Sequence, residues 1–168
     1  EKADKFLKIK EIGTEDIYNF LETVRKEDDP FTFFISDQYY DQMLEEEMNS
    51  QIEYKSLGGE YHYIKISLFT PDVAEEFRAA LGQIQNCENQ ILAIDLRDNP
   101  GGLAVPTNDI LDILLPKCCT SYMVDRNGEI YTYYSDQSQV SFKHIYVFVN
   151  SESASSSELL TLGLDTYL

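Results

Sequence analysis

The pattern of apolar and polar positions separates the chain into a helical N-terminal part and a longer part in which strands and helices alternate. Helical periodicity covers residues 1–28, with Thr14 as a candidate N-cap. It returns over about residues 37–49, where Ser36 can cap the helix. We therefore expect residues 1–50 to form a small helical unit.

The remaining residues, 51–168, are expected to form an α/β core. Alternating apolar positions over residues 51–69, interrupted by Gly58-Gly59, predict a β-hairpin. Two mainly apolar runs, residues 91–96 and 145–149, predict strands that are buried on both faces. A helical pattern precedes the first run and follows each of them. This alternation is typical of an α/β domain with a largely parallel sheet.

Three further features complete the expected core. A helix begins at Thr70-Pro71, an arrangement that is favoured at helix starts. Residues 121–124 and 129–134 predict an antiparallel hairpin at an edge or rim of the domain. The last helix begins at Ser156, and no strand pattern follows it. This ending favours a chain that is truncated at its C-terminus.

Composition narrows the classes of partner. With 168 residues and 43% hydrophobic positions, the chain is long enough for one real core. The net charge of −17, from 30 acidic and 13 basic residues, argues against nucleic acid or an anionic membrane as a partner. Cys87, Cys118 and Cys119 have neither the number nor the spacing of a disulfide framework or zinc site. His62 and His144 are too few for a metal cluster, so no metal or cofactor is expected.

Two turns are candidates for chemistry because each follows a mainly apolar strand, and open α/β sheets bind ligands at the carboxyl ends of their strands. Asn99-Pro100-Gly101-Gly102 has two glycines that let a bound group approach the backbone closely. Residues 153–157 form a serine cluster at the start of a helix. Taken alone, the first is most often only a turn, and the second only a helix cap.

The combination of the two turns is a more specific signal than either turn alone. Residues 95–102, followed about fifty residues later by residues 149–158, closely resemble the carboxy-terminal-processing, or tail-specific, protease family. Residues 63–69 are similar to the family's first core strand, 114–117 to the end of the helix after the glycine turn, and 29–32 to its pre-core segment. The resemblance implies a crotonase/Clp-protease-like core of strand-strand-helix units.

The same resemblance implies the site and its setting. It makes Ser155 the acylated nucleophile of a serine endopeptidase. It makes the backbone N–H groups of Gly101 or Gly102, and of Ser156, the oxyanion hole. Fixed N–H donors and the positive end of a helix suit this role, because they stabilise developing negative charge. The resemblance also implies a polypeptide substrate and an extracytoplasmic location, either secreted, periplasmic or at the cell surface, and leaves homo-oligomerisation open.

The sequence departs from the family at the general base. In the family this base is a lysine in a glycine-flanked turn beyond the nucleophile, and no lysine follows Ser155 here. Lys143 precedes the strand that leads to Ser155, and His144 lies at the entry end of that strand, too far away to replace the lysine. We therefore expect a Ser/Lys dyad whose lysine lies beyond Leu168, and an inactive chain when these residues stand alone.

A second departure is the short connection between the helix over residues 37–49 and the core hairpin. Family members commonly insert a PDZ module there, which captures the substrate's carboxy-terminus, and about ten residues cannot hold one.

Two alternatives remain open. The chain could be a protease-like peptide-binding or scaffold domain that keeps the groove and lacks the base. A crotonase-type acyl-CoA enzyme would share the fold, but the chain has no basic patch for the coenzyme's phosphates, and the serine cluster would be unexplained.

Overall fold

The chain divides into two compact units, Glu1–Glu46 and Glu47–Leu168. The computed structural model describes residues 13–24, 35–47, 49–136 and 139–167. The predicted helical residues before 13 and the pre-core segment 29–32 lie outside the described residues.

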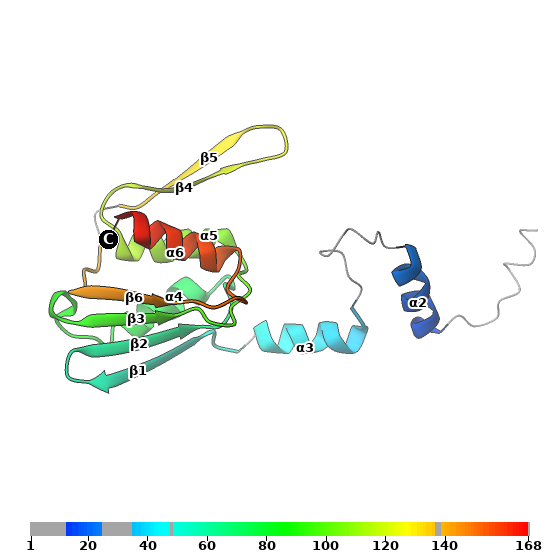
Figure 1. Cartoon of the computed structure of the whole chain (residues 1–168), viewed down its shortest axis with the longest axis horizontal. Coiled ribbons are helices and arrows are strands. Elements are labelled where there is room, and N and C mark those ends of the chain that lie inside the picture. The colour runs from blue at the N-terminus through cyan, green and yellow to red at the C-terminus, as the bar shows by residue number, and fades with distance from the viewer. Residues whose placement is uncertain (1–12, 25–34, 48, 137–138, 168) are drawn as a thin grey trace, which may run out of the picture. The chain divides into compact units, whose positions relative to one another are not determined.

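The first unit contains two short helices, α2 (Thr14–Val24) and α3 (Asp37–Glu47) (Figure 1). The N-cap prediction for α3 is confirmed, since Ser36 Oγ accepts a hydrogen bond from the Tyr39 N–H at 3.2 Å. The apolar stripe of α2, which includes Phe20, is largely exposed.

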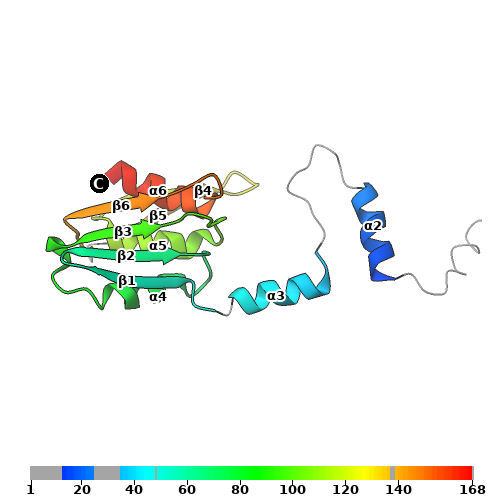
Figure 2. The same cartoon turned by 60° about the horizontal axis from the view of Figure 1, so that its bottom comes forward.

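The second unit is built on a four-stranded sheet with the order β1-β2-β3-β6 (Figures 1 and 2). Its strands are β1 (Ile52–Gly58), β2 (Tyr61–Ile66), β3 (Ile91–Asp95) and β6 (His144–Phe148). β1 and β2 form the predicted antiparallel hairpin, whereas β2, β3 and β6 are parallel. The prediction of an α/β fold with a largely parallel sheet is thus confirmed.

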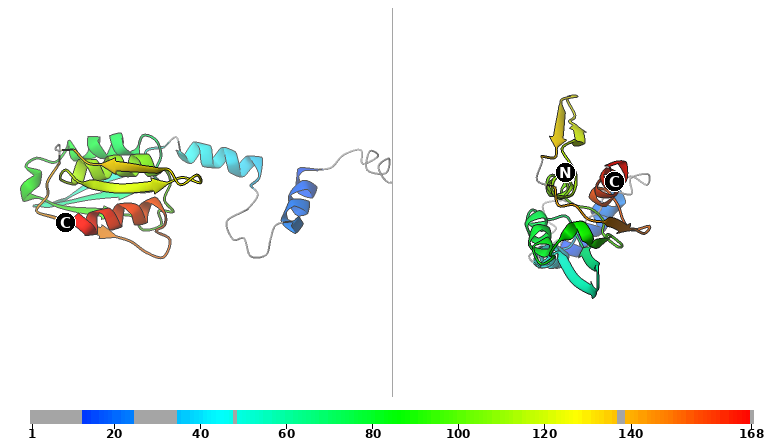
Figure 3. Two further views of the ribbon diagram at one scale, coloured as in Figure 1. Left: turned by 90° about the horizontal axis from the view of Figure 1, so that it is seen from above. Right: turned by 90° about the vertical axis from the view of Figure 1, so that its left-hand side faces the viewer.

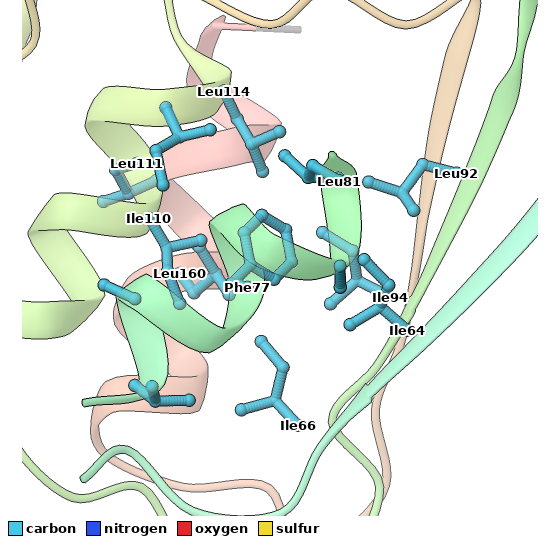
Figure 4. Close-up of a cluster of buried hydrophobic side chains, with 14 of the residues drawn as sticks. Ile64, Ile66, Phe77, Leu81, Leu92, Ile94, Ile110, Leu111, Leu114 and Leu160 are labelled. Carbon is cyan, nitrogen blue, oxygen red and sulfur yellow. The ribbon is translucent and has the colours of Figure 1, made fainter. Parts of the chain in front are cut away.

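Three helices pack on one face of this sheet: α4 (Val73–Leu81), α5 (Ala104–Leu114) and α6 (Ser156–Tyr167). A short 3₁₀ helix, η1 (Cys87–Asn89), precedes β3. Ile64 and Ile94 on the strands are fully buried against Phe77, Leu111 and Leu160 on the helices (Figure 4). Burial of such a side chain stabilises the fold by about 1.5–3 kcal/mol, so this layer holds the strand ends and helix starts in place.

The prediction that the strand at residues 145–149 is buried on both faces is wrong. Tyr146 and Phe148 of β6 are 54% and 47% exposed, whereas Ile145 and Val147 pack against the core. β6 is the last strand of the described sheet, and the helices cover only one of its faces. An apolar run therefore does not distinguish a central strand from an edge strand with one apolar open face.

One helix boundary differs from the prediction: α4 begins at Val73, because residues 70–72 form a turn before the helix. The second predicted antiparallel hairpin is confirmed, and its strands, β4 (Cys119–Val124) and β5 (Ile130–Tyr134), form a two-stranded sheet separate from the main one. Within the described residues, no helix has the length and apolar character needed to cross a membrane.

Candidate active site

The two predicted turns lie side by side because β3 and β6 are neighbouring parallel strands. The turn after β3 bonds directly to the serine turn after β6. Ser153 Oγ donates to the Leu96 carbonyl at 2.7 Å, and the Ala154 N–H donates to the Asn99 carbonyl at 3.2 Å. Two turns that are more than fifty residues apart in the sequence are thus brought together in one site.

Asn99 ties three elements together and is completely buried. Its side-chain amide donates to the Ile66 carbonyl of β2 at 2.9 Å, and its Oδ1 accepts the Gly101 N–H at 2.8 Å. Its own carbonyl accepts the Ser157 hydroxyl of α6 at 3.0 Å. Sequence reasoning missed Asn99 as a separate residue, although an asparagine before Pro-Gly-Gly is a recognisable turn former.

The backbone conformation of the turn requires glycine at positions 101 and 102. Their φ angles are +110° and +127°, which side-chain-bearing residues rarely adopt. A Cβ on Gly101 would lie 2.7 Å from Ser155 Cβ, and one on Gly102 would overlap the Phe69 carbonyl oxygen. The missing side chains therefore let the glycine turn pack directly against Ser155 on one side and the Phe69 backbone on the other.

Ser155 begins α6 in a strained conformation. Its φ of +54° is uncommon for a residue other than glycine, and its side chain is exposed. Its N–H donates to Glu158 Oε2 at 2.8 Å, which is half of a capping box at the start of the helix. A sharp strand-to-helix turn of this kind presents a hydroxyl to solvent at the positive end of a helix.

The neighbouring serines have structural partners. The hydroxyls of Ser153, Ser156 and Ser157 donate to the carbonyls of residues 96, 102 and 99, respectively. Within the described part of the chain, the Ser155 hydroxyl has no hydrogen-bond partner. Ser155 is therefore the serine of the cluster whose hydroxyl is available for chemistry.

The geometry also separates the candidate N–H donors. The Gly101 N–H is taken by Asn99 Oδ1. The Gly102 N–H has no partner among the described residues, and the Ser156 N–H belongs to the first turn of α6, where N–H groups lack helical acceptors. Ser156 Oγ donates to the Gly102 carbonyl at 3.0 Å, which holds these two residues together. Gly102 and Ser156 are thus the better-placed pair of donors.

An ion pair fixes the start of the glycine turn. Asp95 is buried and accepts hydrogen bonds from the Arg97 guanidinium at 2.6 Å and from the Tyr63 hydroxyl at 2.8 Å. Hydrogen bonding from Arg97 holds the pKa of the Asp95 carboxyl well below its usual range. The Arg97 guanidinium also lies over the Phe148 ring, 5.9 Å from its centre. Both side chains thereby connect β3 to β2 and β6 beneath the site.

No candidate base lies beside Ser155 among the described lysines and histidines that follow β3. Lys143 Nζ pairs with Glu60 Oε2 at 2.9 Å. Lys143 and His144 lie at the start of β6, the opposite end from the serine turn, and five strand residues span about 15 Å. The described residues also contain no cluster of ligands for a metal ion.

Two cavities lie along α6, on the side of β6 that the helices cover. One, of about 290 Å³, lies beside the serine turn and is lined in part by Val149, Ser153 and Glu158. The other, of about 490 Å³, lies toward the start of β6, where Lys143 and His144 line it. Of these two, the smaller cavity is the one that residues of the serine turn line.

Fold and site together define a hydrolase-like α/β domain with a serine at a strained turn. Comparison with known families identifies it further: the profile of peptidase family S41 matches residues 60–167. The chain therefore belongs to peptidase family S41. The S41 match and the named relatives described below place it in the carboxy-terminal-processing protease family.

Two curated relatives are named as carboxy-terminal-processing proteases. The chain is 31% identical over 115 residues to the carboxyl-terminal-processing protease of Synechocystis, covering 68% of this chain and 27% of that protein. It is 34% identical over 113 residues to the carboxy-terminal processing protease CtpB of Bacillus subtilis, covering 67% and 24%. The chain thus spans about a quarter of the length of these relatives.

Solved structures share the fold. A photosystem II D1 C-terminal processing protease aligns with a TM-score of 0.59 at 19% identity, over 69% of this chain and 34% of that one. A lipoprotein from Streptococcus agalactiae aligns with a TM-score of 0.58 at 20% identity, over 99% of this chain and 63% of that one. The predicted family fold is thereby confirmed.

Proposed function

We propose that this chain supplies the nucleophile and the oxyanion hole of a serine endopeptidase that uses a Ser/Lys dyad. The observation that carries the proposal is the exposed hydroxyl of Ser155, on a backbone with φ of +54°, packed against the Gly101-Gly102 turn. The family membership supports a polypeptide as the substrate.

In the proposed reaction, Ser155 Oγ attacks the carbonyl carbon of the scissile peptide bond while a base removes its proton. The negative charge that develops on the carbonyl oxygen is stabilised by the N–H groups of Gly102 and Ser156. Each fixed donor of this kind is worth about 3 kcal/mol of transition-state stabilisation. The base then returns the proton to the leaving amine, and water hydrolyses the acyl-enzyme.

We propose that the base is a lysine from a part of the parent protein outside these 168 residues. No lysine follows Ser155 in this sequence, and the described lysine nearest to it in the sequence, Lys143, pairs with Glu60. A lysine that is desolvated in a closed site can lose its proton near neutral pH.

We also propose that the parent protein has an extracytoplasmic location. We propose further that no PDZ module stands between α3 and β1.

The test compares the parent protein with its Ser155→Ala variant. We expect the parent protein to cleave an unstructured polypeptide and the variant to show no cleavage above background. Equal activity of the two would refute the proposal. The 168-residue chain alone is expected to show no turnover.

A second candidate function is a peptide-binding domain without catalysis. The lack of a base beside Ser155 among the described residues favours it. This alternative would be established by a parent protein that binds peptide while Ser155 is neither acylated by substrate nor phosphonylated by a reactive fluorophosphonate.

A further inference from the structure

The serine turn, residues 149–155, is held by the turn after β3 at three points. Two of these points, described above, fix Ser153 and Ala154 through backbone carbonyls. The third point joins the side chains of Asp98 and Asn150, and it fixes the part of the serine turn that lies nearer to β6. This third contact is the one made by a pair of side chains.

Asp98 and Asn150 bond to each other in both directions. The Asp98 backbone N–H donates to Asn150 Oδ1 at 3.0 Å, and Asn150 Nδ2 donates to Asp98 Oδ1 at 2.7 Å. The second bond is charge-assisted, because its acceptor is a carboxylate. The φ of Asp98 is +66°, a conformation that asparagine and aspartate tolerate better than most residues that carry a side chain. Asn150 thus fixes both the backbone and the side chain at the start of the glycine turn.

Asn150 also shapes the serine turn itself. Its N–H donates to Ser153 Oγ at 3.0 Å, its carbonyl accepts the Ser153 N–H at 3.1 Å, and its Oδ1 accepts the Glu152 N–H at 3.2 Å. Ser153 is followed by Ala154 and then by Ser155, whose φ of +54° persists only with support from its surroundings. A shift of Asn150 is therefore transmitted to Ser155 through a closed turn.

We propose that Asn150 is a positioning residue, which holds Ser155 in its reactive place by joining the two turns through Asp98. The proposal rests on the proposed function for the role of Ser155 as the nucleophile. Both side chains of the pair are exposed, so their substitution has little effect on global stability. A displacement of about 1 Å at a reacting group can slow a reaction about a hundredfold. The pair therefore governs the reactivity of Ser155 more than the stability of the domain.

Asn150→Asp turns the contact into a repulsion between two carboxylates and removes the Nδ2 donor. We expect phosphonylation of Ser155 by a fluorophosphonate in the parent protein to slow about tenfold or more at about pH 8. Protonation of one of two neighbouring carboxylates ends the repulsion and supplies a donor, so the ratio of the variant rate to the unsubstituted rate should rise toward about pH 5. Titration of Glu152, Glu158 and the base is common to both proteins and cancels in this ratio.

Exchange of the two residues should restore the contact. In Asp98→Asn with Asn150→Asp, the new amide donates to the new carboxylate, and position 98 keeps a residue that tolerates its φ. We expect this double variant to react within about threefold of the unsubstituted rate, whereas independent structural losses would add. Asp98→Asn alone should react like the unsubstituted protein, because an amide oxygen still accepts Asn150 Nδ2.

A similar pair in the turn between β4 and β5 provides the matched control. Asn127 Nδ2 donates to Asp125 Oδ2 at 3.2 Å, and the Asn127 N–H donates to Asp125 Oδ1 at 2.8 Å. This turn belongs to the separate two-stranded sheet, which Figure 3 shows in yellow, standing away from the main sheet. Asn127→Asp adds the same charge beside a carboxylate, and we expect it to leave the rate unchanged at every pH.

Hydrogen exchange of the serine turn in the parent protein gives a readout that does not require Ser155 to react. We expect residues 149–157 to exchange faster in Asn150→Asp than in the unsubstituted protein, because the turn opens locally. The double variant and Asn127→Asp should exchange at the original rate. The melting temperatures of all variants should differ little from that of the unsubstituted protein.

Three results would each overturn the inference: unchanged exchange of residues 149–157 in Asn150→Asp, a double variant that folds and reacts no better than Asn150→Asp, or an equal loss in Asn127→Asp. Failure of the proposed function gives a different pattern. Ser155 is then phosphonylated in none of the proteins, while exchange of the serine turn still follows the contact between Asp98 and Asn150. Phosphonylation of Ser155 that is insensitive to Asn150 refutes only the positioning role.

Discussion

Replacement of Gly101 by alanine tests the close packing between the glycine turn and Ser155, the proposed nucleophile. The new Cβ would lie 2.7 Å from Ser155 Cβ, 2.8 Å from the Ala154 carbonyl oxygen and 3.0 Å from the Ser156 nitrogen. Carbon atoms in favourable contact are about 3.5–4.0 Å apart, so the backbone on one side must move. The φ of +110° adds the strain of a left-handed conformation.

Gly128 provides the matched control. Its φ is +84°, and a Cβ there would meet nothing within 4 Å. Gly128→Ala therefore isolates the backbone strain, which is about 1–2 kcal/mol. We expect Gly101→Ala to lower the free energy of unfolding by about 4 kcal/mol, because the displaced atoms add to the same strain.

Urea unfolding of the chain measures both variants by linear extrapolation. In the parent protein, phosphonylation of Ser155 by a fluorophosphonate should fall sharply for Gly101→Ala and stay unchanged for Gly128→Ala, since only the first displaces Ser155. The reasoning is refuted if Gly101→Ala costs no more stability than Gly128→Ala. That result would mean that the turn rearranges at little cost in free energy, so that its packing does not fix the position of Ser155.

Three other predictions concern the residues that support the site. Asn99→Ala should lower the free energy of unfolding by about 2–4 kcal/mol in urea, because it leaves buried backbone groups unpaired. Asp95 has a pKa in the folded state below its unfolded value of about 3.9, so its stabilising contribution is present above that value and is lost as the pH falls further. Arg97→Met should therefore lower the melting temperature at neutral pH and flatten its decline below about pH 4; an unchanged acid profile would contradict the ion-pair argument. Glu158→Gln should cost about 0.5–1 kcal/mol in thermal unfolding, since a neutral amide caps the Ser155 N–H less strongly, and a stabilised variant would count against the capping box.

The juxtaposition of Ser155 with Gly101-Gly102 could be anticipated from sequence because it depends on strand order and on the end of the sheet where each turn lies. Parallel neighbours place such turns together whatever the details of their side chains. Which N–H groups are already hydrogen-bonded and which are free to act as donors could not be anticipated. It depends on the side-chain orientation of Asn99, which a hydrophobic pattern does not encode. The exposed face of β6 could not be anticipated for a related reason, since it depends on strand order and on which face the helices cover, and both are properties of the whole domain.

The three bonded serine hydroxyls affect how the nucleophile can be identified. Ser153, Ser156 and Ser157 each cross-link the two turns through a backbone carbonyl, so alanine at any of them deforms the same site. An alanine scan read by activity alone would thus report four essential serines. Measurements of stability separate the four serines. Among them, Ser155 is the one whose hydroxyl can be removed without breaking a described hydrogen bond between the two turns. A loss of activity with an unchanged melting temperature is therefore the signature of the nucleophile in this loop.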